Sequence, residues 1–114
     1  MKTKELTGTA LDWAVAKCEG EEVSLIKGQL ETRWTDNGYK PSTDWALGGP
    51  IIEREEIALE PMTHDEHGDG WLATRVEGPA ICMEFGPTML VAAMRCFVVS
   101  HLGDEIEVPD ELTI

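Results

Sequence analysis

The residues of this chain that could recognise a small molecule gather in one segment, residues 39–54, with the sequence YKPSTDWALGGPIIER. Its aromatic rings, its glycine pair and its polar neighbours are the candidate ligand contacts: Tyr39, Thr43, Asp44, Trp45, Gly48, Gly49 and Arg54. Aromatic residues beside glycines are typical of a rigid loop whose backbone lies close to a bound molecule. We therefore predict a long ordered loop that binds a ligand. Residues 42–44 could instead cap one short helical turn that ends at Gly48.

Arg95 interrupts a near-continuous apolar run, where a guanidinium is costly unless it is paired or belongs to a site. One interpretation is a structural ion pair with one of the abundant carboxylates. The other is an anion contact in a pocket walled by Trp13, Tyr39 and Trp45. Arg54 and Arg75 are further candidates for this contact. Aromatic walls with a few polar anchors hold planar ligands, so this pattern predicts a nucleotide-like ligand. Trp13 lies off the apolar stripe of its helix and could equally flank the core.

Catalytic and metal chemistry have little basis in the sequence. His64 and His67 stand among acidic residues and could bind zinc or manganese, but this spacing on a glycine-rich segment orients nothing. The HExxH, GxSxG, P-loop and Rossmann patterns are absent from the sequence. His101 near a helix end is explained by the helix dipole. We therefore predict no catalytic residues, no metal site and no cofactor.

The charge of the chain limits its partners. It has 22 acidic and 9 basic residues, and a formal net charge of −13. Lysine and arginine provide most of the affinity for a phosphate backbone, so we expect no direct binding to nucleic acid. The same charge keeps the protein in solution and would suit a basic protein partner.

Cysteine usage and hydropathy indicate the compartment. The three cysteines are an odd number without CxxC spacing, which is typical of a reducing environment. The first residues form no apolar signal segment, and the longest apolar run is too short to span a bilayer. We expect a soluble protein in the cytoplasm, without membrane contact.

Two helices are predicted around these residues. The first begins after Thr7 and ends before Gly20, and the second spans Met89–Leu102 and ends at Gly103. The second helix is apolar on almost every side, so it must be buried against the sheet and against either the first helix or a second subunit. We therefore predict a homo-oligomer.

Extended segments complete the predicted fold. Alternation and turn signals place them on both sides of a polar excursion at residues 60–70: residues 22–34, Ile51–Leu59, Trp71–Glu77 and Ala80–Phe85. Residues 1–114 are thus predicted as one α+β domain. In it, two helices pack on a small, mostly antiparallel sheet, and the long ordered central loop carries the site.

Three stretches of the chain resemble the family of small NinX-like proteins of lambdoid tailed phages and prophages. They are TGTALDWAVAKCEG, PSTDWALGGPIIERE and GPTMLVAAMRCFVVSHLGDEIEVPDEL. The resemblance extends from about residue 3 to residue 112 and is least evident in Glu60–Gly70. It implies a phage accessory protein in the cytoplasm of the bacterial host, and it assigns no catalytic residues.

Taken with that resemblance, the sequence predicts a protein that acts by binding and not as an enzyme. The first hypothesis is sequestration of a nucleotide-like host immune signal by an oligomer, which would be an anti-defence role. The second is an acidic inhibitor or DNA mimic that binds a basic host or phage protein through acids such as Glu53, Glu55 and Glu56. A third, a small hydrolase or metal-dependent enzyme, depends on His64 and His67 alone.

Overall fold

The structure is a computed structural model that describes residues 1–32, 38–64 and 68–112. In chain order the described elements are η1 (Thr3–Glu5), α1 (Gly8–Glu19), β1 (Ser24–Ile26), β2 (Gln29–Glu31), α2 (Trp45–Glu55), β3 (Ala58–His64), β4 (Gly68–Glu77), β5 (Ala80–Gly86), α3 (Met89–Leu102) and η2 (Asp110–Leu112). The predicted α+β class is confirmed. The prediction of two helices is wrong, because α2 is a third α-helix in the part of the chain that the structure describes.

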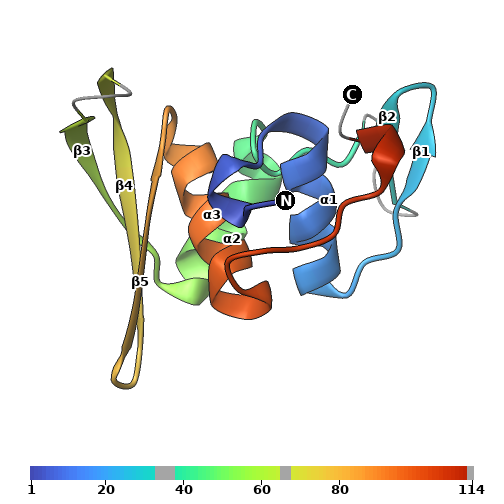
Figure 1. Ribbon diagram of the computed structural model, residues 1–114. Helices are drawn as coiled ribbons and strands as arrows, with labels where there is room; N and C mark the ends of the chain where they lie inside the picture. Colours follow the sequence, from blue (N-terminus) through green and yellow to red (C-terminus); the bar gives the residue numbers. More distant parts are fainter. Residues whose placement is uncertain (33–37, 65–67, 113–114) are drawn as a thin grey trace.

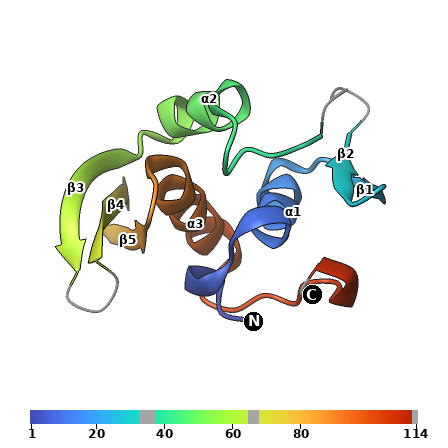
Figure 2. The ribbon, with the colours of Figure 1, turned by 90° about the horizontal axis from the view of Figure 1, so that it is seen from above.

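The larger sheet has the strand order β3–β4–β5, and both neighbouring pairs are antiparallel. α3 packs on one face of this sheet, and α1 packs against α3 on the side away from the sheet (Figure 1). Seen from above, α2 lies beside α3, and the small β1–β2 hairpin lies beyond α1 (Figure 2). The main core therefore lies between the sheet and the helices, with α3 at its centre.

The two predicted helices are confirmed with their boundaries. Thr7 is the extended residue before α1, and Gly20 ends α1 in the left-handed conformation with φ of 73°. The Thr88 hydroxyl begins α3 by accepting a hydrogen bond from the Val91 N–H (3.1 Å). Residues 90–98 are all buried, because the sheet, α1 and α2 surround α3 within one chain. The apolar character of α3 therefore requires no second subunit.

The central loop predicted at residues 35–50 and the predicted strand Ile51–Leu59 are wrong in the main part of what the structure describes, because α2 occupies residues 45–55. The alternative of a helix capped within residues 42–44 is right about where the helix begins and wrong about its end at Gly48. Asp44 begins this helix by accepting a hydrogen bond from the Ala46 N–H (2.9 Å), and Ile51 is buried in the core. The helix continues past Gly48 and through Pro50, although both residues disfavour a helix interior. The cap and the buried apolar face therefore outweigh local propensity.

The polar excursion predicted at residues 60–70 is also wrong for its described part. Residues 58–64 form β3, which pairs with β4 over its whole length. Pro61 is tolerated there because β3 is an edge strand of the described sheet. The other predicted extended segments are confirmed: β1 and β2 lie within residues 22–34, and Trp71–Glu77 and Ala80–Phe85 lie within β4 and β5.

The three α-helices of the described residues run in the same direction, so their amino-terminal ends lie together (Figure 1). The Ser42 N–H, just before α2, donates to Asp12 Oδ1 in α1 (2.8 Å). Gly48 in the first turn of α2 lies against Leu90 in the first turn of α3. At the opposite end, Arg54 of α2 forms an ion pair with Glu19 of α1, and Glu55 of α2 contacts His101 of α3 (3.2 Å). The three helices are thus held together at both ends.

Within the described residues, no helix combines the length and the apolar character that crossing a membrane requires.

Candidate functional site

A small hollow lies where α1, the β1–β2 hairpin and the segment before α2 meet. Its volume is ≈ 130 Å³, which is enough for one ring or one sugar and too small for a whole nucleotide. The side chains that line it come from three separate segments of the chain: Thr9, Asp12, Gln29, Leu30, Tyr39 and Lys40. We call this cavity the Asp12 hollow.

Asp12 is the chemically distinctive residue of the Asp12 hollow. Its side chain belongs to the first turns of α1 and is buried, with 5% of the residue exposed. Burial raises the pKa of Asp12 from 3.8 to about 6, although its interaction with Ser42 and the charge of Lys40 offset part of the rise. At neutral pH the hollow therefore contains a buried carboxylate. A carboxyl group with a shifted pKa in a cleft is a typical mark of a functional site.

Of the predicted site residues, Tyr39 lines this hollow, and Trp13 packs beside it. Tyr39 is buried against Ala16 and Leu30, and its N–H donates to the Leu30 carbonyl (2.6 Å). Burial raises the pKa of Tyr39, so its hydroxyl stays neutral. Trp13 packs against the same cluster, with the Lys17 ammonium 5.3 Å from its ring centre. The fold thus brings Trp13 and Tyr39 together.

The predicted residues around the start of α2 have separate roles in the structure. Asp44 caps the helix, and the exposed Thr43 belongs to the turn that leads into it. Trp45 is 52% exposed, so its ring is accessible from solvent. Gly48 is buried where no side chain fits, whereas Gly49 lies against the Trp45 ring. These residues position the amino-terminal end of α2, but they do not line the Asp12 hollow.

Arg54 lies at the opposite end of α2. Its guanidinium forms an ion pair with Glu19 of α1 and bonds Glu55 on α2 (Nε to Oε2, 2.9 Å). These bonds raise the pKa of Arg54. The structure therefore does not bring Arg54 together with Trp13 or Tyr39.

Arg95 is buried and donates to two backbone carbonyls. Its Nε bonds the Leu6 carbonyl (2.9 Å), and its Nη1 bonds the Phe85 carbonyl (3.0 Å). Burial lowers the pKa of Arg95, and the charge of Glu84 offsets part of this effect. Neither interpretation from the sequence fits these contacts. Among the described residues, Arg95 forms no direct ion pair with a carboxylate, and it does not share a pocket with Trp13. Arg95 instead ties the start of the chain and the end of β5 to α3.

The sequence analysis did not identify Asp12, Lys40, Thr9 and Gln29 as site residues. An acid in the first turns of a helix is already explained by the helix dipole, so Asp12 alone gave no reason to expect a site. Its neighbours in the hollow are distant in sequence, and only the fold brings them to it.

The segment of the metal hypothesis is described only in part, because Asp65, Glu66 and His67 lie outside the described residues. Within the described residues, no group of three or more histidine, cysteine, aspartate or glutamate side chains is placed to hold a metal ion.

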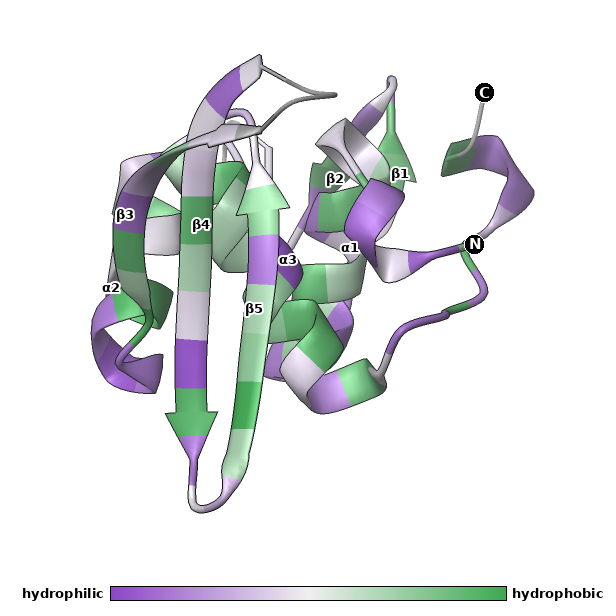
Figure 3. Ribbon diagram, turned by 60° about the vertical axis from the view of Figure 1, so that its left-hand side comes forward, coloured by the Kyte–Doolittle hydropathy of each residue, from purple (hydrophilic) through white to green (hydrophobic). Residues whose placement is uncertain are grey.

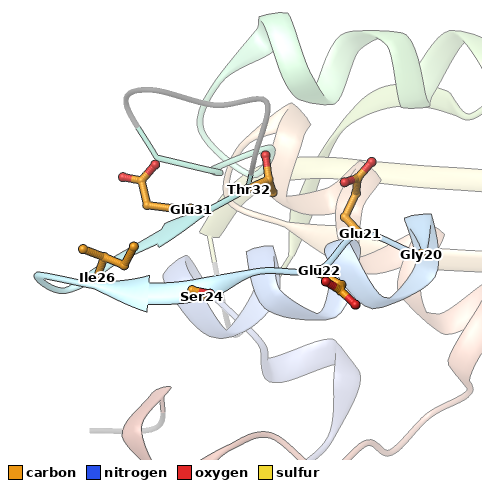
Figure 4. Close-up of a pocket in the computed structure, with 7 residues that line it drawn as sticks. All are labelled: Gly20, Glu21, Glu22, Ser24, Ile26, Glu31 and Thr32. Carbon is orange, nitrogen blue, oxygen red and sulfur yellow. The ribbon is translucent and has the colours of Figure 1, made fainter.

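A second, larger hollow of ≈ 670 Å³ lies between the end of α1 and the β1–β2 hairpin. Three carboxylates line it, from Glu21, Glu22 and Glu31. In Figure 4, Glu21 and Glu31 point to the same side of the hairpin as Thr32, whereas Glu22 points to the other side. We call it the acidic hollow, since its charge would attract a cationic group.

Comparisons with known proteins place the chain in a family. The chain matches the family described as Bacteriophage P22, NinX over residues 2–101, a span that includes every side chain named in the Asp12 hollow. No curated protein matches the chain. The chain therefore belongs to the phage protein family named for NinX of bacteriophage P22.

Proposed function

We propose that this phage protein acts by binding, and that the Asp12 hollow receives one part of a small nucleotide-like ligand. The observation that carries the proposal is the buried Asp12 carboxylate at the wall of a hollow that Lys40 also lines. A buried carboxylate accepts hydrogen bonds from the N–H groups of a base or from the hydroxyls of a ribose. The Lys40 ammonium would pair with a phosphate.

The size of the hollow limits what enters it. Pockets that enclose a complete drug-sized ligand measure roughly 300–1,000 Å³, whereas this hollow measures ≈ 130 Å³. In this proposal a base or a sugar enters, and the phosphates remain outside near Lys40. Tyr39 and Leu30 supply the apolar wall, and Trp13 packs against the cluster to which both belong.

The remaining predicted residues act around the hollow in this proposal. Trp45 offers an exposed ring on which a planar group can stack. Thr43, Asp44, Gly48 and Gly49 hold the start of α2 in place. Arg54 and Arg95 contribute through the positions of the helices that they connect.

The phage family gives this binding a biological purpose. We propose that the protein sequesters a nucleotide-derived signal of host defence in the bacterial cytoplasm. Sequestration needs affinity and no chemical step, which is consistent with the absence of any catalytic motif from the sequence.

Isothermal titration calorimetry with a panel of mononucleotides, dinucleotides and cyclic nucleotides tests the proposal. We expect Asp12→Asn and Lys40→Ala to weaken binding about tenfold or more, which is about 1.4 kcal/mol. Asp12→Asn is not expected to disturb the fold, because the amide oxygen of the new side chain can still accept the Ser42 N–H. Glu53→Gln, an exposed change on α2, is the matched control.

The pH dependence sharpens this test. A ligand that donates to Asp12 should bind more tightly as the pH rises through about 6, where this carboxyl ionises. Asp12→Asn should remove that dependence. Failure of every nucleotide to bind, or equal affinity of the wild-type protein and Asp12→Asn, would contradict the proposal.

The acidic hollow favours a second candidate function, the binding of a basic host or phage protein. Such binding should weaken as salt is added, because exposed charges are screened over roughly 8 Å at physiological ionic strength. Glu21→Gln and Glu31→Gln should weaken it further, whereas Asp12→Asn should not. If a basic protein is captured but its binding changes neither with salt nor with these two substitutions, this candidate function is excluded.

A further inference from the structure

We propose that the face of the three-stranded sheet turned away from α3 is a contact surface for a second copy of this chain. We call it the open face. Strand register defines it, because residues alternate between the two faces. Ala73 is fully buried toward α3, and Cys82 contacts the Cys96 carbonyl of α3, so these two residues mark the covered face. The apolar side chains of the open face that solvent reaches at least in part are Met62, Val76, Ile81, Met83 and Phe85. Leu72 has the same register but is buried, with 8% of the residue exposed.

The open face is apolar and largely accessible. Val76 is 64% exposed, Ile81 65% and Met83 54%. No described helix lies over these strands on this side (Figure 3). Exposed apolar patches of roughly 300–600 Å² are the largest on typical monomers and are often functional. Val76, Ile81 and Met83 lie on two adjacent strands and form an exposed apolar patch of this kind.

Charge indicates which partner fits. Among the described side chains of the open face only Glu60 is charged, although the whole chain has a net charge of −13. A basic protein would be attracted to the acidic surfaces instead, and an anionic lipid surface would be repelled by the chain. A second copy carries the same apolar face with Glu60 as its one charged residue among the described side chains, and two identical faces can pack around a twofold axis.

The dimensions of the sheet predict the strength of this contact. Two stacked sheets lie about 10 Å apart with interdigitating side chains. The strands contain 7, 10 and 7 residues, so the stacked faces would bury on the order of 1,000 Å² in total, near the lower limit of specific interfaces. We therefore expect a reversible dimer with a dissociation constant in the micromolar range.

Salt provides a signature of this dimer. Both copies carry the same net charge, so their general repulsion opposes an apolar contact. Added salt screens this repulsion, and dimerisation should strengthen. The binding of a basic partner would respond in the opposite direction.

Sedimentation velocity over the micromolar concentration range, at low and high salt, tests the inference. Ile81→Glu and Met83→Glu should weaken dimerisation about tenfold or more, because each places a charge in the contact. Leu25→Glu is the matched control, since Leu25 is 41% exposed on the β1–β2 hairpin, away from the sheet. Circular dichroism verifies that each variant is folded.

Several results would overturn the inference. The first is a wild-type chain that stays monomeric over the whole concentration range. The second is a dimer that dissociates more readily as salt is added. The third is a dimer that Leu25→Glu disrupts and Ile81→Glu leaves intact. Binding of a monomer to neutral phosphatidylcholine vesicles that Ile81→Glu abolishes would assign the open face to lipid instead. None of these measurements uses a nucleotide, so they are independent of the proposed ligand.

Discussion

At the scale of single residues, two buried charges behave differently from each other. Arg95 satisfies its guanidinium with two backbone carbonyls, which makes it a structural residue. Asp12 accepts one backbone N–H and faces a hollow, which makes it available to a ligand. The sequence directed attention to Arg95 because its neighbours are apolar, whereas the better candidate is Asp12.

The shifted pKa of Asp12 has a measurable effect on stability. The folded chain binds this proton more tightly than the unfolded chain, because the pKa is about 6 when folded and 3.8 otherwise. This difference adds about 2–3 kcal/mol to the free energy of unfolding below about pH 4. The contribution is lost as the pH rises through about 6. Asp12→Asn has no such proton, so its unfolding free energy should lack this component.

Urea unfolding of the wild-type protein and Asp12→Asn from about pH 4 to about pH 7 measures the effect. The wild-type protein should lose stability relative to the variant across this window. A difference that stays constant with pH would show that the Asp12 carboxyl is not buried as described.

At the scale of elements, α2 is the part of the fold that sequence rules misjudge. Gly48, Gly49 and Pro50 are poor helix formers, so their segment suggests a loop. The Asp44 cap and the burial of Ile51 stabilise a helix in spite of them. α1 and α3 were predictable because the residue types at their starts, Thr7 and Thr88, and the glycines after their ends are local signals, although only Thr88 accepts a capping hydrogen bond.

The two adjacent glycines of α2 should respond very differently to alanine. In Gly48→Ala, the new Cβ would lie 2.5 Å from the Pro41 carbonyl oxygen and 2.6 Å from Leu90 Cδ2, which should destabilise the fold by about 1–3 kcal/mol. In Gly49→Ala, the Cβ would lie at an ordinary 3.7 Å from the Trp45 ring, so this change should cost much less than Gly48→Ala. Helix propensity favours alanine by about 0.5–1 kcal/mol, but the following Pro50 disfavours a helical residue that carries a Cβ and offsets this gain.

Urea unfolding of both variants compares these effects directly. Each glycine is the control for the other, because the substitution and the helix are the same. Changes of the same sign and size in both variants would contradict the described packing of α2 on α3.

At the scale of the whole molecule, the three parallel helices need contacts that hold both of their ends. Glu55 provides the contact at the carboxyl-terminal end, where it binds Arg54 (2.9 Å), Arg75 (3.0 Å) and His101 (3.2 Å). Burial alone would raise the pKa of Glu55, but these partners outweigh burial and lower it. Cations near helix carboxyl-terminal ends also favour the helix dipoles. Glu55 is therefore a structural acid and not a freely exposed one.

Glu55→Gln should destabilise the protein by about 1–3 kcal/mol, because it removes the charge that Arg75 faces in a partly buried position. Glu53→Gln removes the same charge from an exposed position on the same helix and should change stability by less than about 0.5 kcal/mol. Urea unfolding of the wild-type protein and both variants measures these two changes in stability. Equal midpoints would show that the network at Glu55 contributes nothing.

The sequence by itself determined the α+β class, the boundaries of α1 and α3, the strands within β4 and β5, and the resemblance to the phage family that the comparisons confirm. These features follow from caps, turns and alternation, in which each residue acts on near neighbours.

Only the tertiary structure decided that residues 45–55 form a helix, that Arg95 bonds Leu6 and Phe85, and that Asp12 faces a hollow. Arg95 and Leu6 are 89 residues apart, and Asp12 and Ser42 are 30 apart. The free energy of burial and of hydrogen bonding depends on which distant groups meet, and local sequence patterns contain no information about that.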